Sequence, residues 1–247
     1  MIPVRTSICL LITVLAVGQT GSTHSGPAAV SRAMPPAIVI GFVGGFIRHD
    51  NLAHSEVQLA ARLRQAYPLG VEVDTFESYR AGKARNRVLR LLDTNHDGTL
   101  TADEKAHAHI IIYGHSWGGS EAINLARDLE KDSIPVLLTV QVDSISIYHN
   151  DRVIPANVAR AANFYQPNGL LHGQPEIRAA DSTRTRIIGN FRSDYTASSY
   201  NCEQYPWYDR VFAKTHTQIE CDADVWKRAE ALIRSDLATV TENETEP

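Results

Sequence analysis

Residues 110–119 read Ile-Ile-Ile-Tyr-Gly-His-Ser-Trp-Gly-Gly, an apolar run that passes directly into a segment with helical spacing. A short apolar run followed at once by a helix is typical of a buried strand in an α/β protein. The pattern Gly-x-Ser-x-Gly at the junction is typical of a tight strand-to-helix turn that exposes its serine. Gly114 and Gly118 suit this turn, because a Cβ would clash where backbone packs against backbone. The stretch therefore predicts that Ser116 lies at the carboxyl end of a strand as a nucleophile.

Strand and helix patterns alternate along the rest of the chain. This alternation predicts a mostly parallel sheet with helices on both faces, in a single α/β domain. Ligands of such sheets bind beyond the carboxyl ends of the strands, where the turn places Ser116. Strands are predicted over residues 37–42, 71–76, 109–114, 135–142, 163–166 and 185–190, and helices over residues 52–67, 81–92, 118–131, 154–162 and 222–237.

The composition sets the size and the partners of the predicted domain. Of the 247 residues, 43% are hydrophobic, which is enough for one well-buried core. The formal net charge is −4 and no basic run interrupts the chain, which argues against nucleic acid as a partner. The sequence leaves the oligomeric state open.

The N-terminus has the features of a secretory signal peptide over residues 1–18. Arg5 supplies a positive charge, and residues 7–18 are uncharged and mostly apolar but too short to span a bilayer. Ala16 and Gly18 provide a small-x-small cleavage site. An uncleaved membrane anchor is the alternative, but the apolar core is short for that role. We therefore expect a secreted or periplasmic protein without a stable membrane anchor.

Two polar segments flank the predicted domain, which spans residues 37–237. Residues 19–36 are rich in Gly, Ser, Thr, Ala and Pro, a composition typical of a flexible leader. Residues 238–247 are acidic and lack core residues, so they are predicted to form a disordered tail.

The cysteines divide between the predicted signal peptide and the predicted domain. Cys9 lies in the signal peptide, so Cys202 and Cys221 remain after cleavage. An even pair in an exported chain predicts one disulfide bond, and two free buried thiols are the alternative. The bond would close a loop of about 20 residues and stabilise the fold by on the order of 3 kcal/mol.

A serine hydroxyl needs a general base to take its proton, and the base needs a carboxylate to orient it. His216 is the favoured base, because it follows the last predicted strand, in a segment predicted to be a mobile loop at the same end of the sheet. His149 and His172 lie in polar segments and are the weaker alternatives. His115 lies inside the turn and is predicted to point away from the hydroxyl of Ser116 and to pack in the core.

The orienting acid has two main candidates. Asp143 directly follows the strand predicted over residues 135–142, so its carboxylate is well placed to accept a hydrogen bond from His216. Asp181 is the alternative, although an aspartate before Ser-Thr is also typical of a turn. Glu176 is a further candidate. The sequence thus favours Asp143 and leaves Asp181 open.

An oxyanion that forms during attack needs two N–H donors. The first is the amide of Trp117, the residue after the candidate nucleophile. Phe42 or Val43 is predicted to supply the second, because the glycine-containing stretch 41–45 follows the first predicted strand. A phosphate-binding loop is the alternative for this stretch, but it lacks the Gly-x-Gly-x-x-Gly spacing and a Walker lysine.

With these residues in this order, residues 37–237 resemble the α/β-hydrolase superfamily. The resemblance rests on residues 41–45, on the stretch 114–119, on Asp143 and on His216. It implies transfer of an acyl group to water through an acyl-serine intermediate, as in esterases, lipases and thioesterases, with a small-molecule or lipid acyl substrate. The family more often carries its acid one strand later than Asp143, which is a departure from its pattern.

Residues 93–104 match the loop of an EF-hand at each diagnostic position. Gly98 suits the sharp turn at the sixth position, and a predicted helix enters the loop. The loop precedes the strand that leads to Ser116, so a bound calcium ion would lie at the opposite end of the sheet and act structurally. The predicted calcium ligands are Asp93, Asn95, Asp97, the carbonyl of Thr99, Thr101 through a water, and Glu104.

Two functions are compatible with these features. The first is an exported serine hydrolase that cleaves an ester or a thioester and is stabilised by structural calcium. The second is a calcium-stabilised binding or scaffold module that keeps the fold without turnover. The presence of Ser116, His216 and a candidate acid favours the hydrolase.

Overall fold

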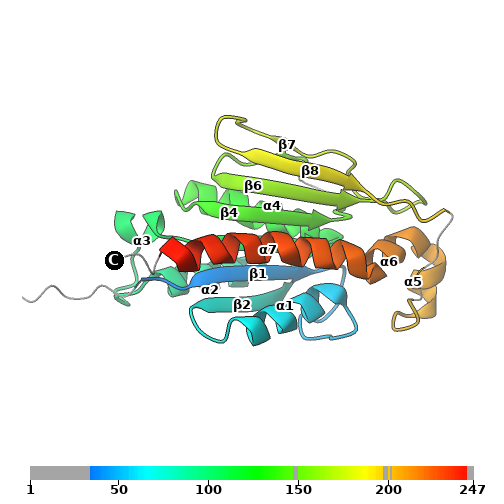
Figure 1. The fold of residues 1–247 in the computed structure, drawn as a ribbon, viewed down its shortest axis with the longest axis horizontal. Helices are drawn as coiled ribbons and strands as arrows, with labels where there is room; N and C mark the ends of the chain where they lie inside the picture. The colour runs from blue at the N-terminus through cyan, green and yellow to red at the C-terminus, as the bar shows by residue number, and fades with distance from the viewer. Residues whose placement is uncertain (1–33, 147–149, 197–199, 201, 244–247) are drawn as a thin grey trace, which may run out of the picture. The chain divides into compact units, whose positions relative to one another are not determined.

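Six parallel strands form the central sheet, in the order β2-β1-β3-β4-β6-β8 (Figure 1). The computed structural model describes residues 34–146, 150–196, 200 and 202–243, and all of them belong to one compact unit. The six strands are β1 (Ala37–Val43), β2 (Val71–Glu77), β3 (Ile110–His115), β4 (Val136–Val142), β6 (Val158–Tyr165) and β8 (Arg186–Arg192). Two short strands, β5 (Val153–Ile154) and β7 (Arg178–Ala179), pair separately.

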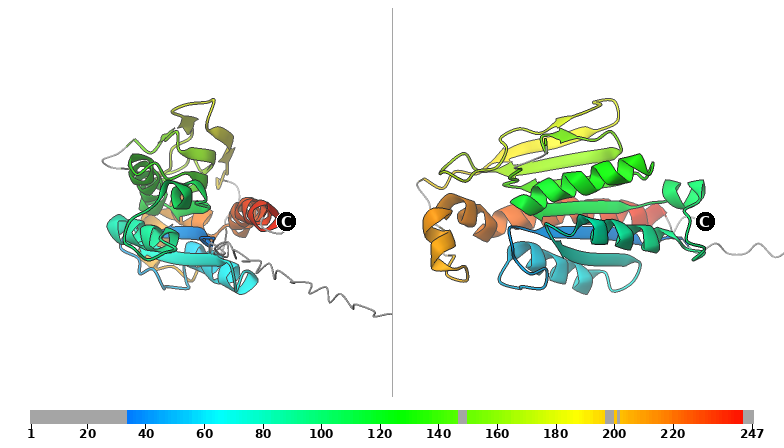
Figure 2. Two further views of the ribbon diagram at one scale, coloured as in Figure 1. Left: turned by 90° about the vertical axis from the view of Figure 1, so that its left-hand side faces the viewer. Right: turned by 180° about the vertical axis from the view of Figure 1, so that it is seen from behind.

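Helices cover both faces of this sheet. The four that do so are α1 (Ser55–Ala66) and α7 (Ala223–Asn243) on one face, and α2 (Ala81–Leu92) and α4 (Trp117–Lys131) on the other. The view from behind in Figure 2 has α2 and α4 in front of the sheet and α7 behind it. The predicted mostly parallel sheet with helices on both faces is therefore confirmed.

The strand β3 shows why its sequence is a continuous apolar run. Ile110 and Ile112 belong to the core under α2 and α4, whereas Ile111 and Tyr113 belong to the core under α1 and α7. All four side chains are fully buried. A strand covered on both faces has no solvent side, so it needs apolar residues at every position. Because β3 lies between β1 and β4, it carries the turn at Ser116 to the middle of the sheet edge.

The prediction of a helix over residues 154–162 is wrong. These residues contribute to β5 and to β6, and β6 pairs with β4 on one side and with β8 on the other. Ala161 and Ala162 favour a helix by intrinsic propensity, but both are fully buried inside the sheet. Tertiary packing of a central strand has overridden the local preference.

Two further corrections concern the C-terminal part. The segment around His216, predicted as a mobile loop, is the helix α6 (Lys214–Cys221), which follows the short helix α5 (Trp207–Phe212). Four of the buried residues of α6 are polar, so an apolar period could not reveal it. The helix α7 continues to Asn243, so residues 238–243 of the predicted disordered tail are helical. The predicted signal peptide, most of the leader and the last four residues lie outside the described residues.

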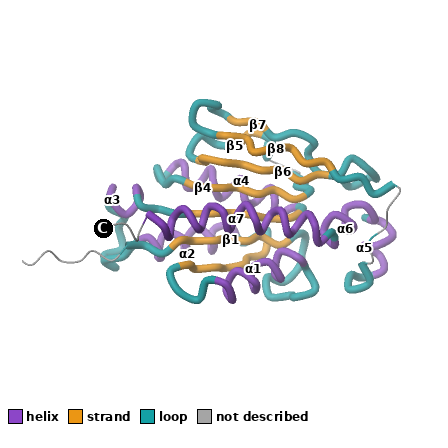
Figure 3. Tube along the Cα trace, in the orientation of Figure 1, coloured by secondary structure: helices purple, strands orange, loops and turns teal. Residues whose placement is uncertain are grey.

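The two ends of the sheet carry different features. Figure 3 shows α3 (Ala102–Ala106) beside the amino ends of the strands, whereas α5 and α6 lie beyond the carboxyl ends. The loop 93–104 therefore lies at the end of the sheet opposite to Ser116, as predicted.

A matched pair of glycine substitutions tests the packing of α4 against the sheet. A Cβ added at Gly118 would lie 2.3 Å from the carbonyl oxygen of Phe42, whereas one added at Gly82 in α2 would meet nothing within 4 Å. We expect Gly118→Ala to lower the free energy of unfolding by about 3 kcal/mol, because neither backbone can move aside. Gly82→Ala should raise it by up to about 1 kcal/mol, because alanine favours a helix. Urea unfolding measures both, and equal changes in the two variants would contradict this packing.

Candidate active site

Ser116 occupies a strained turn between β3 and α4. Its backbone has φ 57° and ψ −126°, a sparsely populated conformation for a residue with a side chain. The turn is fixed by hydrogen bonds from the Ser116 N–H to the carbonyl of Val142 (3.0 Å) and from the Ile145 N–H to the carbonyl of Ser116 (3.1 Å). A Cβ at Gly114 would lie 2.3 Å from the Gly118 carbonyl oxygen, which explains the glycine. Such strain is concentrated at functional sites.

His216 and Asp143 form a buried hydrogen-bonded pair. The Nδ1 of His216 lies 2.7 Å from Oδ2 of Asp143, whose side chain is fully buried. Asp143 also accepts hydrogen bonds from the backbone N–H of Gly173 (2.7 Å) and from the backbone and side-chain N–H groups of Gln166 (3.2 and 3.0 Å). A carboxylate can only accept, so Nδ1 of His216 donates and Nε2 is left as the basic nitrogen.

The other acid and base candidates lie elsewhere. Asp181 is half-buried, and its Oδ1 accepts from the backbone N–H and the hydroxyl of Thr183, as a turn residue does. Glu176 and His172 are exposed, and His149 lies outside the described residues. The structure thus brings Asp143, and not Asp181, to His216.

Ser116 and His216 line the same cavity, which has a volume of about 370 Å³. This size lies within the range of small-molecule sites. Much of the remaining wall is apolar, and it includes Ile47, Trp117, Ile145, Leu171, Tyr205 and Ala213. Phe46 packs edge-on against Trp117 with 5.4 Å between the ring centroids and is 85% exposed, so it lies at the surface next to the cavity.

The two residues predicted to complete an oxyanion hole lie inside β1. Phe42 and Val43 are fully buried, and Phe42 pairs with Gly114 of β3. The wall of the cavity instead contains the next two residues, Gly44 and Gly45, together with Trp117. The predicted donors are wrong by one or two residues because β1 continues to Val43. The apolar pattern of the sequence did not reveal where this strand ends.

His115 does not only pack in the core. Its ring stacks on the ring of His216 with 4.6 Å between the centroids. Burial, with the charges of the neighbouring His216 and His54, holds the pKa of His115 well below its usual range. His115 is therefore a neutral imidazole directly behind the His216 ring.

A cluster of buried polar groups lies next to this stacked pair. It contains His54, which precedes α1, Glu56 in the first turn of α1, and Glu220 in α6. None of the three was predicted from the sequence, because none belongs to a recognisable motif. The one available signal was Glu56, which precedes the apolar face of α1 that contains Val57.

The loop 93–104 joins α2 to α3 in a helix–loop–helix arrangement. Asp93 accepts hydrogen bonds from the backbone N–H groups of Asp97 (3.2 Å) and Gly98 (3.0 Å), and Gly98 has φ 83°. Of the other predicted ligands, Asn95 accepts from the Asp97 N–H, and Asp97 accepts from the N–H and the hydroxyl of Thr99. The loop is therefore closed by its own side chains around the glycine turn.

Glu104 ends the loop in a capping box with Thr101. Its carboxylate accepts from the backbone N–H groups of Thr101 and Thr94, both at 2.9 Å. These hydrogen bonds, led by that from Thr101, lower the pKa of Glu104 to about 2. Within the described part of the chain, the carboxylates of Asp93, Asp97 and Glu104 do not come within 4.8 Å of one another as a group.

Cys202 and Cys221 are joined by a disulfide bond, with 5.8 Å between their Cα atoms. Cys221 is the last residue of α6, the helix that carries His216. The bond therefore fixes one end of this helix to the segment before α5. None of the helices in the described ranges is long and apolar enough to cross a membrane.

Comparisons with known proteins concern the fold only. No protein-family model and no curated protein matches the chain. A dienelactone hydrolase from Anabaena variabilis has 12% identity and a TM-score of 0.43, with 83% of this chain and 86% of that chain covered. The α/β hydrolase domain-containing protein 10 from mouse has 10% identity and a TM-score of 0.43, with 82% and 90% covered. The thioesterase RedJ from Streptomyces coelicolor has 11% identity and a TM-score of 0.37, with 81% and 100% covered.

Proposed function

We propose that this protein is an exported serine hydrolase of the α/β-hydrolase type that cleaves an ester or a thioester. One observation carries the proposal. Ser116, strained at the carboxyl end of β3, lines the same cavity as His216, whose Nδ1 lies 2.7 Å from the buried Asp143. A nucleophile, a base and an orienting acid at one cavity are what acyl transfer requires.

In the proposed mechanism, Nε2 of His216 takes the proton from the hydroxyl of Ser116 as the oxygen attacks the substrate carbonyl. Asp143 holds the imidazole in the tautomer that can accept this proton and stabilises the imidazolium that forms. His216 then donates the proton to the leaving group. A water molecule hydrolyses the acyl-serine by the same steps, with His216 again as the base.

The oxyanion is proposed to bind at the N-terminus of α4. The amide of Trp117 supplies one donor, and the positive end of the helix dipole favours the negative charge. The amide of Gly45 is proposed as the second donor in place of Phe42 or Val43, since Gly45 lines the cavity and the N–H of the neighbouring Gly44 donates to Glu56. The substrate is proposed to be a small-molecule or lipid acyl compound with an apolar acyl group, because the cavity walls are largely apolar.

Trapping of the acyl-enzyme tests the proposal. The protein is mixed with p-nitrophenyl butyrate, quenched in acid and digested for mass spectrometry. We expect the butyryl mass on the peptide that contains Ser116 and none on that peptide in Ser116→Ala. A folded protein that releases no p-nitrophenol and carries no acyl group, with acyl chains from short to long, would favour the binding or scaffold module instead.

Export is supported by the disulfide bond between Cys202 and Cys221, because such bonds persist in oxidising compartments. This is in keeping with the signal peptide predicted over residues 1–18. We accordingly propose a secreted or periplasmic location.

A structural calcium ion in the loop 93–104 is part of the proposal. The donors Asp93, Asn95, Asp97 and Glu104 are all oxygen ligands, which a hard cation prefers. The turn at Gly98 and the helices α2 and α3 on either side of the loop support this proposal. At the amino end of β3, the ion would stabilise the strand that leads to Ser116 without contacting the substrate.

Calcium removal should destabilise the fold. We expect EDTA to lower the melting temperature by about 5 °C, because a ligand at 100 times its Kd contributes about 2.7 kcal/mol. Added to protein that has been reloaded with zinc after the EDTA treatment, calcium should restore the original value in differential scanning calorimetry, whereas zinc alone should not. Glu104→Gln should lose this response, and Asp103→Asn, its neighbour outside the predicted ligand set, should keep it. A calcium response that survives in Glu104→Gln would count against the site.

A further inference from the structure

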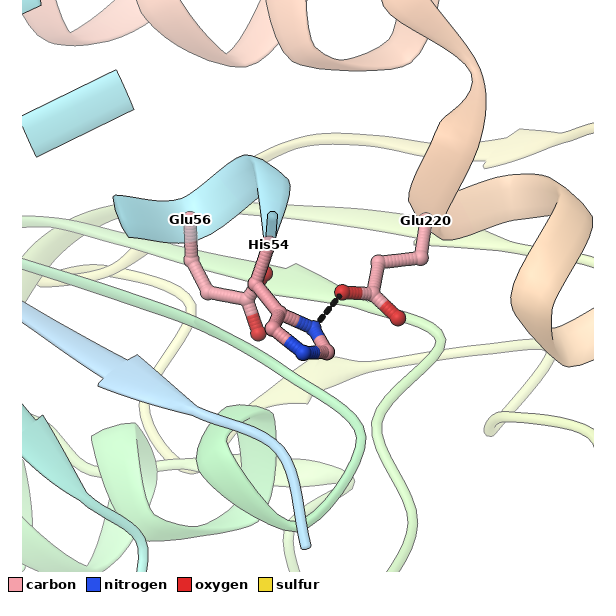
Figure 4. Close-up of side chains that lie close together, drawn as sticks. All are labelled: His54, Glu56 and Glu220. Atoms are coloured by element: carbon pink, nitrogen blue, oxygen red, sulfur yellow. Dashed lines mark hydrogen bonds and ion pairs between the residues drawn. The ribbon is translucent and has the colours of Figure 1, made fainter. Parts of the chain in front are cut away.

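Three buried side chains converge at the wall of the cavity, where His54 and Glu220 are among the lining residues. His54, Glu56 and Glu220 each offer a ligand atom, and these atoms all lie within 4.8 Å of one another. Figure 4 shows the imidazole and the two carboxylates pointing toward one another. The residues are only 6%, 0% and 4% exposed.

The hydrogen bonds within the protein leave part of this cluster unsatisfied. Oε1 of Glu56 accepts from the Gly44 N–H at 3.2 Å, whereas Oε2 is buried without a hydrogen-bond partner among the described residues. Among the described residues, neither ring nitrogen of His115 has a hydrogen-bond partner either. Nδ1 of His115 lies 3.6 Å from Oε2 of Glu220 and 3.8 Å from Oε1 of Glu56, too far for hydrogen bonds. Buried polar groups are nearly always paired, so these atoms indicate a missing partner.

The charges of the cluster show what kind of partner it requires. The carboxylates of Glu56 and Glu220 are both buried, and each has a ligand atom within 4.8 Å of the other. A divalent cation would neutralise both carboxylates at once. A neutral imidazole has one ring nitrogen with a free electron pair, so one nitrogen of His115 can bind a metal ion. Glu220 also lies in the last turn of α6, where the helix dipole favours a positive charge.

We propose that His54, Glu56 and Glu220 bind a zinc ion, with His115 as the fourth donor. One or two imidazoles with carboxylates form a ligand set that zinc accepts, whereas calcium and magnesium prefer oxygen ligands alone. Neighbouring ligand atoms of a tetrahedral zinc site lie roughly 3.4 Å apart. The distances from His54 to Glu220 (2.7 Å) and from His115 to Glu220 (3.6 Å) lie on either side of this value, so small side-chain shifts complete the site.

The position of the site points to a structural role near the reaction. The ion would join the start of α1 to α6, the helix that carries His216. It would also fix His115, whose ring stacks on that of His216. The zinc site would therefore hold the proposed base in place from behind, while the disulfide at Cys221 holds the end of the same helix.

Metal analysis of the full chain tests this inference. The protein is depleted with a chelator, titrated with ZnCl₂ and freed of excess by gel filtration, after which zinc and calcium are counted separately by mass spectrometry. We expect one tightly bound zinc per chain. Cobalt substitution should give the intense visible bands of a four-coordinate ion. A folded wild-type protein that retains no zinc would overturn the site, and the weak bands of six-coordinate cobalt would do so as well.

A pair of histidine variants localises the ion. His54→Asn should weaken zinc binding by about 100-fold or more, since even the loss of a residue that only orients a metal ligand costs 10- to 100-fold. His172→Asn changes an exposed histidine outside the cluster and should leave the affinity unchanged. Glu56→Gln retains an oxygen for the Gly44 N–H and provides a second test if His54→Asn fails to fold. Equal affinities in wild type, His54→Asn and Glu56→Gln would overturn the assignment.

The inference does not depend on the proposed hydrolase activity. A fluorophosphonate label on Ser116 is measured in the same zinc-loaded and zinc-depleted samples. Labelling without zinc binding would remove the metal site and leave the hydrolase in place. Zinc binding without labelling would support the metal site and count against the hydrolase.

Discussion

Ser116→Ala should lower kcat for a p-nitrophenyl ester by about 10⁶-fold, the largest effect expected from any single change in this protein. The hydroxyl is the proposed nucleophile, and without it the acyl-serine intermediate cannot form. Residual hydrolysis would come from binding and from the oxyanion donors alone. Alanine retains the Cβ, so the strained backbone at φ 57° persists and the stability should hardly change. Initial rates and urea unfolding of the same preparation measure both quantities.

Ser120→Ala is the matched control for this experiment. Ser120 is one turn further along α4 and is also buried, but it does not line the cavity wall with Ser116 and His216. Its removal should change kcat by no more than about twofold, in line with the small effects of substitutions away from the reacting atoms. If Ser116→Ala retained a tenth or more of the wild-type rate, the acyl-serine mechanism would be wrong.

Asp143→Asn should lower kcat by about 10⁴-fold, the effect of this change in the best-known serine hydrolases. The hydrogen bonds around Asp143 explain why. Its Oδ1 accepts from the backbone N–H groups of Gly173 and Gln166, so the amide oxygen of asparagine must take that position. The NH₂ group then faces His216 and donates to Nδ1. The proton of the neutral imidazole is forced onto Nε2, which can no longer accept the proton of Ser116.

Asp181→Asn is the control, because Asp181 is the alternative acid of the sequence analysis. Asp181 holds a turn through Thr183 away from the cavity, so its change should leave kcat within about twofold of wild type. Steady-state kinetics with both variants decide between the two acids. A loss in Asp181→Asn that matched the loss in Asp143→Asn would mean that the buried pair has no catalytic role.

Features that depend on short stretches of the sequence could be predicted. The turn at Ser116 was predictable because strand, glycines and helix follow one another within residues 110–131. Asp143 was placed next to His216 because both follow predicted elements that end at the same edge of the sheet. These placements required only short-range patterns and the rule that parallel strands share one binding edge.

Features that depend on packing between distant segments could not be predicted. Residues 158–162 of β6 were predicted as a helix because their alanines favour one locally, whereas the position of β6 between β4 and β8 is a property of the whole sheet. The helix α6 was missed because four of its five buried residues are polar, so they give no apolar period. His54 and Glu220 are separated by 166 positions, and nothing near either residue indicates that they meet.

The backbone hydrogen bonds at the edge of the sheet have a consequence for the evolution of specificity. The N–H of Ser116 donates to the carbonyl of Val142, and the N–H of Asp143 donates to the carbonyl of Phe164. Main-chain hydrogen bonds therefore fix the proposed nucleophile and acid to neighbouring strands. Leu171 and Ala213, by contrast, line the cavity from outside the strands. Substrate preference can therefore drift, or be engineered, by exchange of these outer residues while the reactive geometry is inherited intact.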